Sequence, residues 1–234
     1  MIAREGLLLI FIGLVVTLAF LWGATRWNSF WLFGASAVFA LLTVFTTFFF
    51  RDPPRTVPAG SNILVAPADG KIVDIDTLAN HPFIGGEALK ISIFLSVFDV
   101  HINRTPAAGT IDFVNYNPGK FLAAYEDKAS EVNEQTEIGM TARNGHKLVY
   151  KQIAGLIARR IVCRLTPNDS VAAGEKFGMI KFGSRTDLIV PSDSRLEIKL
   201  GDQVYAGESV IGYLSGTPYT GESETAVKEN NAEI

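Results

Sequence analysis

The first fifty residues are almost entirely apolar, and charged residues among them are rare: Arg4, Glu5 and Arg26. As a helix, Leu7–Trp22 would span about 24 Å at about 1.5 Å per residue. Phe30–Phe50 would span about 31 Å, close to the roughly 30 Å hydrocarbon core of a bilayer. The link Gly23–Asn28 is short, so we predict a transmembrane or membrane-embedded helical hairpin over residues 1–51.

Basic residues flank this hairpin, with Arg4 before it and Arg51 and Arg55 after it, whereas only Arg26 marks the turn. The positive-inside tendency predicts a cell (inner) membrane protein with both hairpin ends, and all that follows, on the cytoplasmic side. A cleaved signal peptide is disfavoured because no small-x-small site precedes a polar start and a second apolar run follows at once. A hairpin that dips into one leaflet is the alternative to one that spans the bilayer.

A second region begins at Asp52, because Pro53 and Pro54 prevent helix continuation. Residues 52–216 read as short strands separated by Gly, Pro and Asn turns, and residues 217–234 as a disordered polar tail. Only Gly119–Ala129 has helical character. The expected strands are Asn62–Ala66, Gly70–Asp76, Leu89–Ser96, Thr110–Tyr116, Lys147–Ile153, Arg159–Leu165, Gly178–Lys181, Leu188–Val190, Leu196–Ile198 and Val210–Leu214.

Two segments share a turn-and-strand design, Pro67–Val73 and Lys199–Glu208. The design resembles the barrel-sandwich folds of lipoyl and biotinyl carriers. The expected fold class is therefore mainly β, a barrel-sandwich-like domain behind a helical hairpin, although a fold by itself does not define a function.

Composition excludes several classes of protein and partner. Hydrophobic residues make up 48% and charged residues 19%, which excludes a disordered chain. The net charge of −3 gives no basic surplus, so no nucleic-acid partner is expected. The single cysteine, Cys163, cannot form an internal disulfide, which fits a reducing compartment. No metal is expected as a cofactor.

The most informative stretch surrounds Gly183-Ser184, which spacing alone would interpret as a tight turn between two apolar strands. With other segments, it gives the chain a resemblance to the short, bacterial and archaeal-type phosphatidylserine decarboxylase proenzymes, which are pyruvoyl-dependent. The resemblance runs from about Pro53 to Leu214. The matching segments are Ala66–Gly70, Phe98–Arg104, Asn117–Phe121, Lys128–Ser130 with Asn133-Glu134, Gln152–Gly155, Ala158–Ile161 and Phe182–Arg185.

The resemblance implies autocatalytic cleavage between Gly183 and Ser184. The Ser184 hydroxyl would attack the Gly183 carbonyl, and elimination and hydrolysis would then turn Ser184 into a pyruvoyl cofactor. The products would be a β chain of residues 1–183 and an α chain of residues 184–234, which remain together as a heterodimer; a higher homo-oligomer is also considered. Family positions match His101 as the base and Asp69 as the group that orients it.

The activity implied is decarboxylation of phosphatidylserine in the membrane, through a Schiff base, to phosphatidylethanolamine and CO2. One alternative is the same chemistry on archaetidylserine, because the reaction occurs at the headgroup. A second is a non-enzymatic, membrane-anchored carrier or adaptor. It is disfavoured because Lys71, beside Asp69-Gly70, lacks the methionine flank of a carrier lysine.

One departure from the family concerns proton donation. Longer relatives have two histidines three residues apart, and Phe98 stands where the first would be. The proton donor for decarboxylation is therefore left open between His101 and a bound water.

Arginines are the remaining candidates for contacts with the substrate. Arg104 is a candidate for the substrate carboxylate or phosphate, with an ordinary surface arginine as the alternative. Arg185 and the pair Arg159-Arg160 could likewise contact anionic headgroups or cap strand ends. His81 and His146 are interpreted as surface loop residues, and Phe83-Ile84 as either a hydrophobic lip at the membrane or ordinary core.

Overall fold

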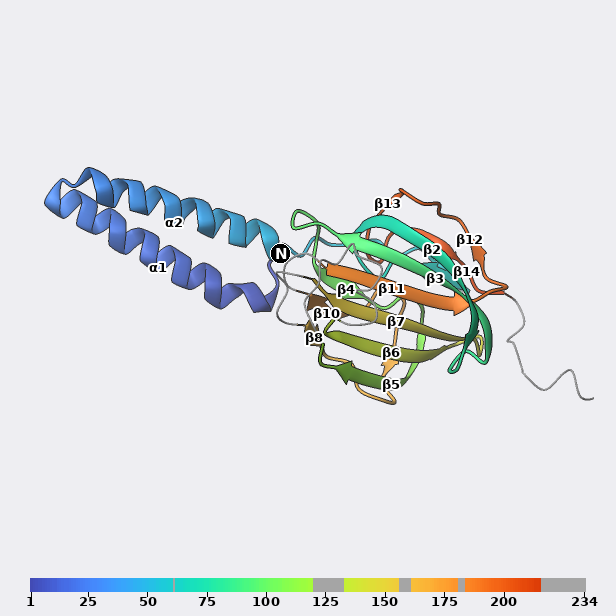
Figure 1. The fold of residues 1–234 in the computed structure, drawn as a ribbon. Helices are drawn as coiled ribbons and strands as arrows, with labels where there is room; N and C mark the ends of the chain where they lie inside the picture. Colours follow the sequence, from blue (N-terminus) through green and yellow to red (C-terminus); the bar gives the residue numbers. More distant parts are fainter. Residues whose placement is uncertain (61, 120–132, 156–160, 181–183, 216–234) are drawn as a thin grey trace, which may run out of the picture. The chain divides into compact units, whose positions relative to one another are not determined.

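The computed structural model describes residues 1–60, 62–119, 133–155, 161–180 and 184–215 (Figure 1). Contacts divide them into two compact units, which we describe separately. The first contains residues 1–54 and 97–100, and the second contains the described residues from Arg55 onward, apart from 97–100.

The first unit is a helical hairpin, as predicted. Helix α1 spans Arg4–Trp27 and α2 spans Phe30–Phe49. Asn28 makes the turn in the left-handed conformation, with φ 48°. Both helices are long and apolar enough to cross a membrane. The observed α1 is longer than the expected apolar run.

Polar and aromatic contacts join the two helices of this hairpin. The rings of Phe20 and Phe39 stack with centroids 5.2 Å apart, and Ser36 Oγ donates a hydrogen bond to the Thr17 carbonyl at 3.1 Å. At the open end, Arg51 donates a hydrogen bond of 2.6 Å from its NH2 group to the Phe98 carbonyl. Residues 97–100 therefore belong with the hairpin.

The second unit is mainly β, as predicted, and its described strands form three antiparallel sheets (Figure 1). The largest has the order β13-β2-β3-β11-β7-β6-β5-β9, and the smaller ones are β1-β14-β12 and β4-β10-β8. Their bounds are β1 Ile63–Val65, β2 Gly70–His81, β3 Gly86–Leu95, β4 Ile102–Arg104, β5 Gly109–Asn117, β6 Gln135–Ala142, β7 Lys147–Ala154, β8 Ile161–Cys163, β9 Ser170–Val171, β10 Lys176–Ile180, β11 Ser184–Pro191, β12 Arg195–Leu196, β13 Gln203–Val204 and β14 Val210–Tyr213.

The large sheet curls so that one face encloses the core (Figure 1). Along β11, alternate residues face opposite sides. Leu188 and Val190 belong to the main core, together with Tyr150 of β7 and Ile91 of β3. Their register partners confirm that these side chains share one face. This interior face is the one on which Ser184 also lies, by the same alternation.

Strand β6 is absent from the sequence prediction. Its centre contains Gly139, a residue type that is depleted in strands. The structure explains this glycine, because a Cβ at that position would lie 2.1 Å from the Phe113 ring of the neighbouring strand. The segment proposed as helical, Gly119–Ala129, lies outside the described residues except for Gly119. The proposed tail, residues 217–234, lies wholly outside them.

Candidate active site

Ser184 is the first residue of β11, a strand in the middle of the large sheet. Leu95 of β3 and Ala154 of β7 lie opposite it in register. Its side chain is fully buried, and its Oγ has no hydrogen-bond partner among the described residues. An unpaired buried hydroxyl costs about 1–3 kcal/mol, so it requires an explanation, and a chemical role is one such explanation. Gly183, the other residue of the expected cleavage site, lies outside the described residues.

His101 immediately precedes β4 and is fully buried. Its carbonyl accepts a hydrogen bond from the Ile180 N–H at 3.4 Å. Ile180 is the last residue of β10, four positions before Ser184. Strands β4 and β10 lie side by side (Figure 1), and this pairing holds His101 beside Ile180, the last residue of β10.

Asp69 lies in the turn that leads into β2 and is 4% exposed. Its Oδ1 accepts a hydrogen bond from the Ala206 N–H at 2.8 Å, and its Oδ2 lies 2.6 Å from an Arg55 nitrogen. Gly70 follows with φ +152°, and a Cβ there would lie 2.2 Å from the Phe94 carbonyl oxygen. Only glycine fits this close approach. The turn that carries Asp69 is therefore held both by the contacts of the Asp69 carboxyl group and by the packing of Gly70 against Phe94.

Arg55 connects this carboxylate to a second one. Its NH1 group donates to Glu208 Oε2 at 2.7 Å, and the Thr56 N–H donates to the other Glu208 oxygen at 3.1 Å. Burial lowers the pKa of Arg55, but hydrogen bonds and attraction from Glu208 and Asp69 outweigh it and raise the pKa overall. The hydrogen bond from Arg55, followed by that from Thr56, lowers the pKa of Glu208. The Arg55 guanidinium therefore stays charged at neutral pH, and it lies between the carboxyl groups of Asp69 and Glu208.

In the sequence, Arg55 was interpreted only as a basic residue after the hairpin, and its contacts with Asp69 and Glu208 were not predicted. Its two partners lie 14 and 153 positions away in the chain. No local pattern around an arginine after two prolines indicates such distant partners.

The other candidate arginines have protein partners of their own. Arg104, 8% exposed, donates from NH1 to the Gly174 carbonyl at 2.8 Å. Arg185 is 2% exposed and donates to Asp187 at 2.7 Å and to the Ser92 hydroxyl at 2.6 Å. These contacts account for the burial of Arg185 without a substrate. Arg159 and Arg160 lie outside the described residues.

The prediction that His146 is a surface loop residue is wrong, because its side chain is buried and the residue is only 2% exposed. Its Nε2 lies 2.9 Å from the Ser215 carbonyl oxygen. His81 is half-buried at the end of β2, and burial lowers its pKa. Ile84 is buried and packs with Phe83 in a small cluster on the outer face of the sheet, which favours the core interpretation of this pair.

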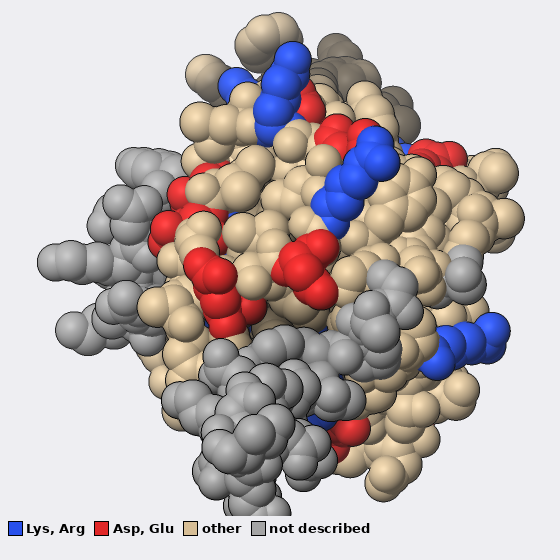
Figure 2. All heavy atoms as spheres, turned by 90° about the vertical axis from the view of Figure 1, so that its right-hand side faces the viewer, with Lys and Arg blue, Asp and Glu red and all other residues tan. Residues whose placement is uncertain are grey.

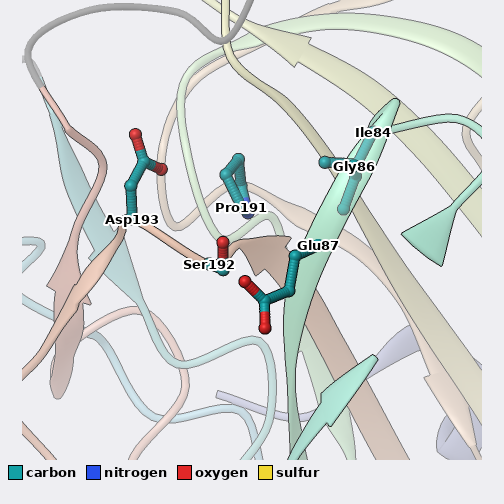
Figure 3. A pocket seen from close by; sticks show the side chains of 6 residues that line it. All are labelled: Ile84, Gly86, Glu87, Pro191, Ser192 and Asp193. Atoms are coloured by element: carbon teal, nitrogen blue, oxygen red, sulfur yellow. The ribbon is translucent and has the colours of Figure 1, made fainter. Parts of the chain in front are cut away.

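A pocket of about 300 Å³ lies at the opposite end of β11 (Figure 3). Its lining residues are Ile84, Gly86, Glu87, Pro191, Ser192 and Asp193. Pro191 ends the strand that Ser184 begins, a separation of roughly 23 Å at about 3.3 Å per residue. The pocket is therefore separate from the residues proposed for chemistry.

Surface charge, metal-ligand patterns and the cysteine Cys163 add three observations on the described residues. The face seen in Figure 2 carries grouped acidic side chains with separate basic ones, so it is not a continuous basic surface. Among the described residues, no group of three or more His, Cys, Asp or Glu side chains could hold a metal ion. Burial raises the pKa of Cys163, which makes this thiol a weak nucleophile at neutral pH.

Fold and site together define a β-rich enzyme domain that follows an apolar helical hairpin and encloses a buried serine hydroxyl at the start of a central strand. Comparison with known proteins gives the family. The phosphatidylserine decarboxylase family matches residues 42–212.

Individual relatives extend over most of the chain. The phosphatidylserine decarboxylase proenzyme of Desulfotalea psychrophila is 46% identical over 213 residues, which cover 91% of this chain and 96% of that protein. The proenzyme of Symbiobacterium thermophilum is 45% identical over 213 residues, 91% of this chain and 95% of its own. That of Chlorobium phaeobacteroides strain BS1 is 49% identical over 173 residues, 74% and 80% of the two chains. The chain belongs to the phosphatidylserine decarboxylase family and is a decarboxylase.

Proposed function

We propose that this chain decarboxylates phosphatidylserine to phosphatidylethanolamine and CO2 after cleaving itself between Gly183 and Ser184. The observation that carries the proposal is the Ser184 hydroxyl, buried and without a hydrogen-bond partner among the described residues. It occupies the position that the family resemblance assigns to the cleavage site, and the relatives are named proenzymes.

The cleavage begins at the Ser184 hydroxyl. Its oxygen attacks the carbonyl carbon of Gly183, and the acyl group moves from nitrogen to oxygen to give an ester. Loss of the Ser184 α-proton then breaks the bond between Cβ and the ester oxygen, which releases residues 1–183 as a carboxylate. The dehydroalanine that remains takes up water and loses ammonia, which leaves a pyruvoyl group at position 184.

A serine hydroxyl needs a base to take its proton. We assign that role to His101, whose backbone lies beside the end of β10, and the orienting role to Asp69. The contacts of Asp69 with Arg55 and with the Ala206 N–H fix its carboxylate, as an orienting group requires. A carboxylate has about four lone-pair sites, so these two contacts leave capacity for a third.

The surroundings of residue 184 fit a small reactive ketone. Leu95 and Ala154 lie opposite it and are fully buried, which keeps water from a carbonyl at this position. The pyruvoyl group would supply a carbonyl that can condense with the substrate amine and draw in the electron pair that stays on the headgroup fragment when CO2 leaves. The remaining tasks, binding the headgroup and delivering a proton, fall to side chains of the chain itself.

The substrate stays in the bilayer, so an anchor would confine the search to the membrane surface and raise the effective concentration. We assign α1 and α2 this role and place the catalytic domain on the cytoplasmic side, following the arginines at the hairpin ends. The two chains produced by cleavage would remain associated, because β11 lies between β3 and β7 of the other chain.

An activity assay tests the proposal. The full chain in detergent with phosphatidylserine should release CO2 and form phosphatidylethanolamine, whereas Ser184→Ala should do neither. Borohydride, which reduces a ketone, should abolish the activity of the wild-type protein. Activity of Ser184→Ala, or wild-type activity that resists borohydride, would refute the proposal.

A further inference from the structure

Three interior side chains near Ser184 have polar atoms without partners. Thr186 Oγ1, Gln152 Oε1 and Asn103 Nδ2 have no hydrogen-bond partner among the described residues, and all three residues are fully buried. Buried polar groups are nearly always paired, and exceptions require an explanation such as a ligand or a catalytic role. Neither the family resemblance nor the proposed cleavage assigns these three residues a function.

Strand register places this group next to Ser184. Thr186 follows Ser184 by two positions, so both side chains share a face and are separated by about 6.5 Å along the strand. Gln152 of β7 lies directly opposite Thr186. Its Nε2 donates to Asn103 Oδ1 of β4 at 2.9 Å and contacts the Val162 carbonyl at 3.2 Å. The amide of Asn103 is therefore held over the same interior face.

The strand residues around this group are neutral. Leu95 and Ala154 lie opposite Ser184, and Ile93 lies opposite Thr186. Arg185, between Ser184 and Thr186 in sequence, faces the other side of the sheet and is paired with Asp187 at 2.7 Å. On β3, β7 and β11, the interior face near Ser184 thus offers uncharged hydrogen-bonding groups.

We propose that Thr186 and Asn103 form the subsite that receives the carboxylate of the serine headgroup. The Thr186 hydroxyl and the Asn103 amide donate hydrogen bonds to the carboxylate oxygens, and Gln152 is a positioning residue that orients Asn103. The roughly 6.5 Å between positions 184 and 186 suits a headgroup whose amine is held at 184. The inference rests on the proposed function, because that function supplies the substrate.

Neutral donors suit a carboxylate that must leave. During decarboxylation the bond between the α-carbon and the carboxylate carbon breaks and CO2 departs without charge, while the electron pair stays on the headgroup fragment, which later takes up a proton. An arginine would bind the charged ground state more strongly than the transition state and raise the barrier. Hydroxyl and amide donors among buried apolar residues orient the carboxylate while stabilising its charged ground state less than an arginine would, so they raise the barrier less.

The test compares phosphatidylserine, whose headgroup has a carboxylate, with phosphatidylethanolamine, whose headgroup has the amine but no carboxylate. Full-length Thr186→Val is incubated with phosphatidylserine or phosphatidylethanolamine and cyanoborohydride, and covalent coupling of the lipid amine is measured by intact mass. We expect normal self-cleavage and unchanged coupling of phosphatidylethanolamine. Coupling of phosphatidylserine should fall about 10- to 100-fold, as expected for loss of a hydrogen bond to a charged group, and Thr186→Ser should restore it.

Ser194→Ala is the matched control. Its hydroxyl is also buried and without a partner among the described residues, but it lies beyond the other end of β11, so both lipids should couple as in the wild type. If Thr186→Val does not cleave, Asn103→Leu should give the same lipid-selective loss. Equal loss for both lipids, or no loss, in a cleaved variant would overturn the subsite. A wild-type protein that couples neither lipid would instead overturn the proposed function.

Discussion

The Arg55 guanidinium lies between two carboxylates, 2.6 Å from Asp69 and 2.7 Å from Glu208. Its side chain is 8% exposed and that of Asp69 is 5% exposed, whereas Glu208 is 36% exposed. Solvent weakens an exposed ion pair to little or nothing, but the loss of one partner from a buried pair leaves an uncompensated charge. The contact with Asp69 is thus the one that matters for the proposed relay, in which Asp69 orients His101 and His101 takes the proton of Ser184.

We therefore expect Arg55→Met to slow self-cleavage about 10- to 100-fold, because Asp69 loses a charge-assisted hydrogen bond worth about 1.5–3 kcal/mol. The rate is read from denaturing gels of freshly synthesised protein. Glu208→Gln is the control and should cleave at nearly the wild-type rate. A wild-type rate for Arg55→Met would show that this contact does not support the relay.

Single residues also show where sequence reasoning is limited. Ser184, His101 and Asp69 were recognised because each belongs to a contiguous family segment. Asn103 and Gln152 also lie in family segments, but their grouping with Thr186 was not recognised, because it joins β4, β7 and β11 and becomes visible only in the register of the strands.

At the scale of elements, apolar runs gave most strands within a few residues. The hairpin, β2, β5, β7 and β14 were predicted because their polarity pattern is clear. Strand β11 was predicted only over Leu188–Val190, whereas it begins at Ser184. Its first four residues, Ser-Arg-Thr-Asp, are polar and resemble a turn in sequence, yet all four are buried between β3 and β7.

Gly139 provides a test at this scale. Replacement by Val would place side-chain atoms against the Phe113 ring, where even a Cβ lies at 2.1 Å. We expect a loss of about 1–3 kcal/mol in the free energy of unfolding, read as a lower melting temperature in detergent. Adding Phe113→Ala should recover part of the loss. Gly34→Ala, where nothing lies within 4 Å of the added Cβ, should not lower the melting temperature. A wild-type melting temperature for Gly139→Val would contradict this account of β6.

At the scale of the whole molecule, the chain combines an apolar hairpin with a β-rich domain, and the pattern of apolar runs and turn residues predicted both. The 48% hydrophobic content averages a strongly apolar segment before residue 51 and a less apolar remainder. Many α1 and α2 side chains are exposed, including Leu41 at 70%. Exposed apolar surfaces of this kind mark sites of contact with a membrane or another protein, and the assigned anchor role predicts contact with lipid.

Leu41→Arg places a charge at the centre of α2 and should weaken membrane insertion by about 2.5–3.5 kcal/mol. The measurement is the fraction of full-length protein that remains in membranes after alkaline carbonate extraction, which should fall. Asn28→Lys, at the hairpin turn, is the control and should be retained. Equal retention of Leu41→Arg would show that α2 does not lie in the hydrocarbon core.

The most direct measurement of the central claim is the intact mass of the purified protein under denaturing conditions. The account predicts two chains, residues 1–183 and residues 184–234 with a blocked N-terminus. Their masses should sum to that of the precursor plus one water minus one ammonia, and Ser184→Ala should give a single chain. A single wild-type chain, or two chains that sum to the precursor plus one water alone, would contradict the account, because no ketone would then stand at position 184.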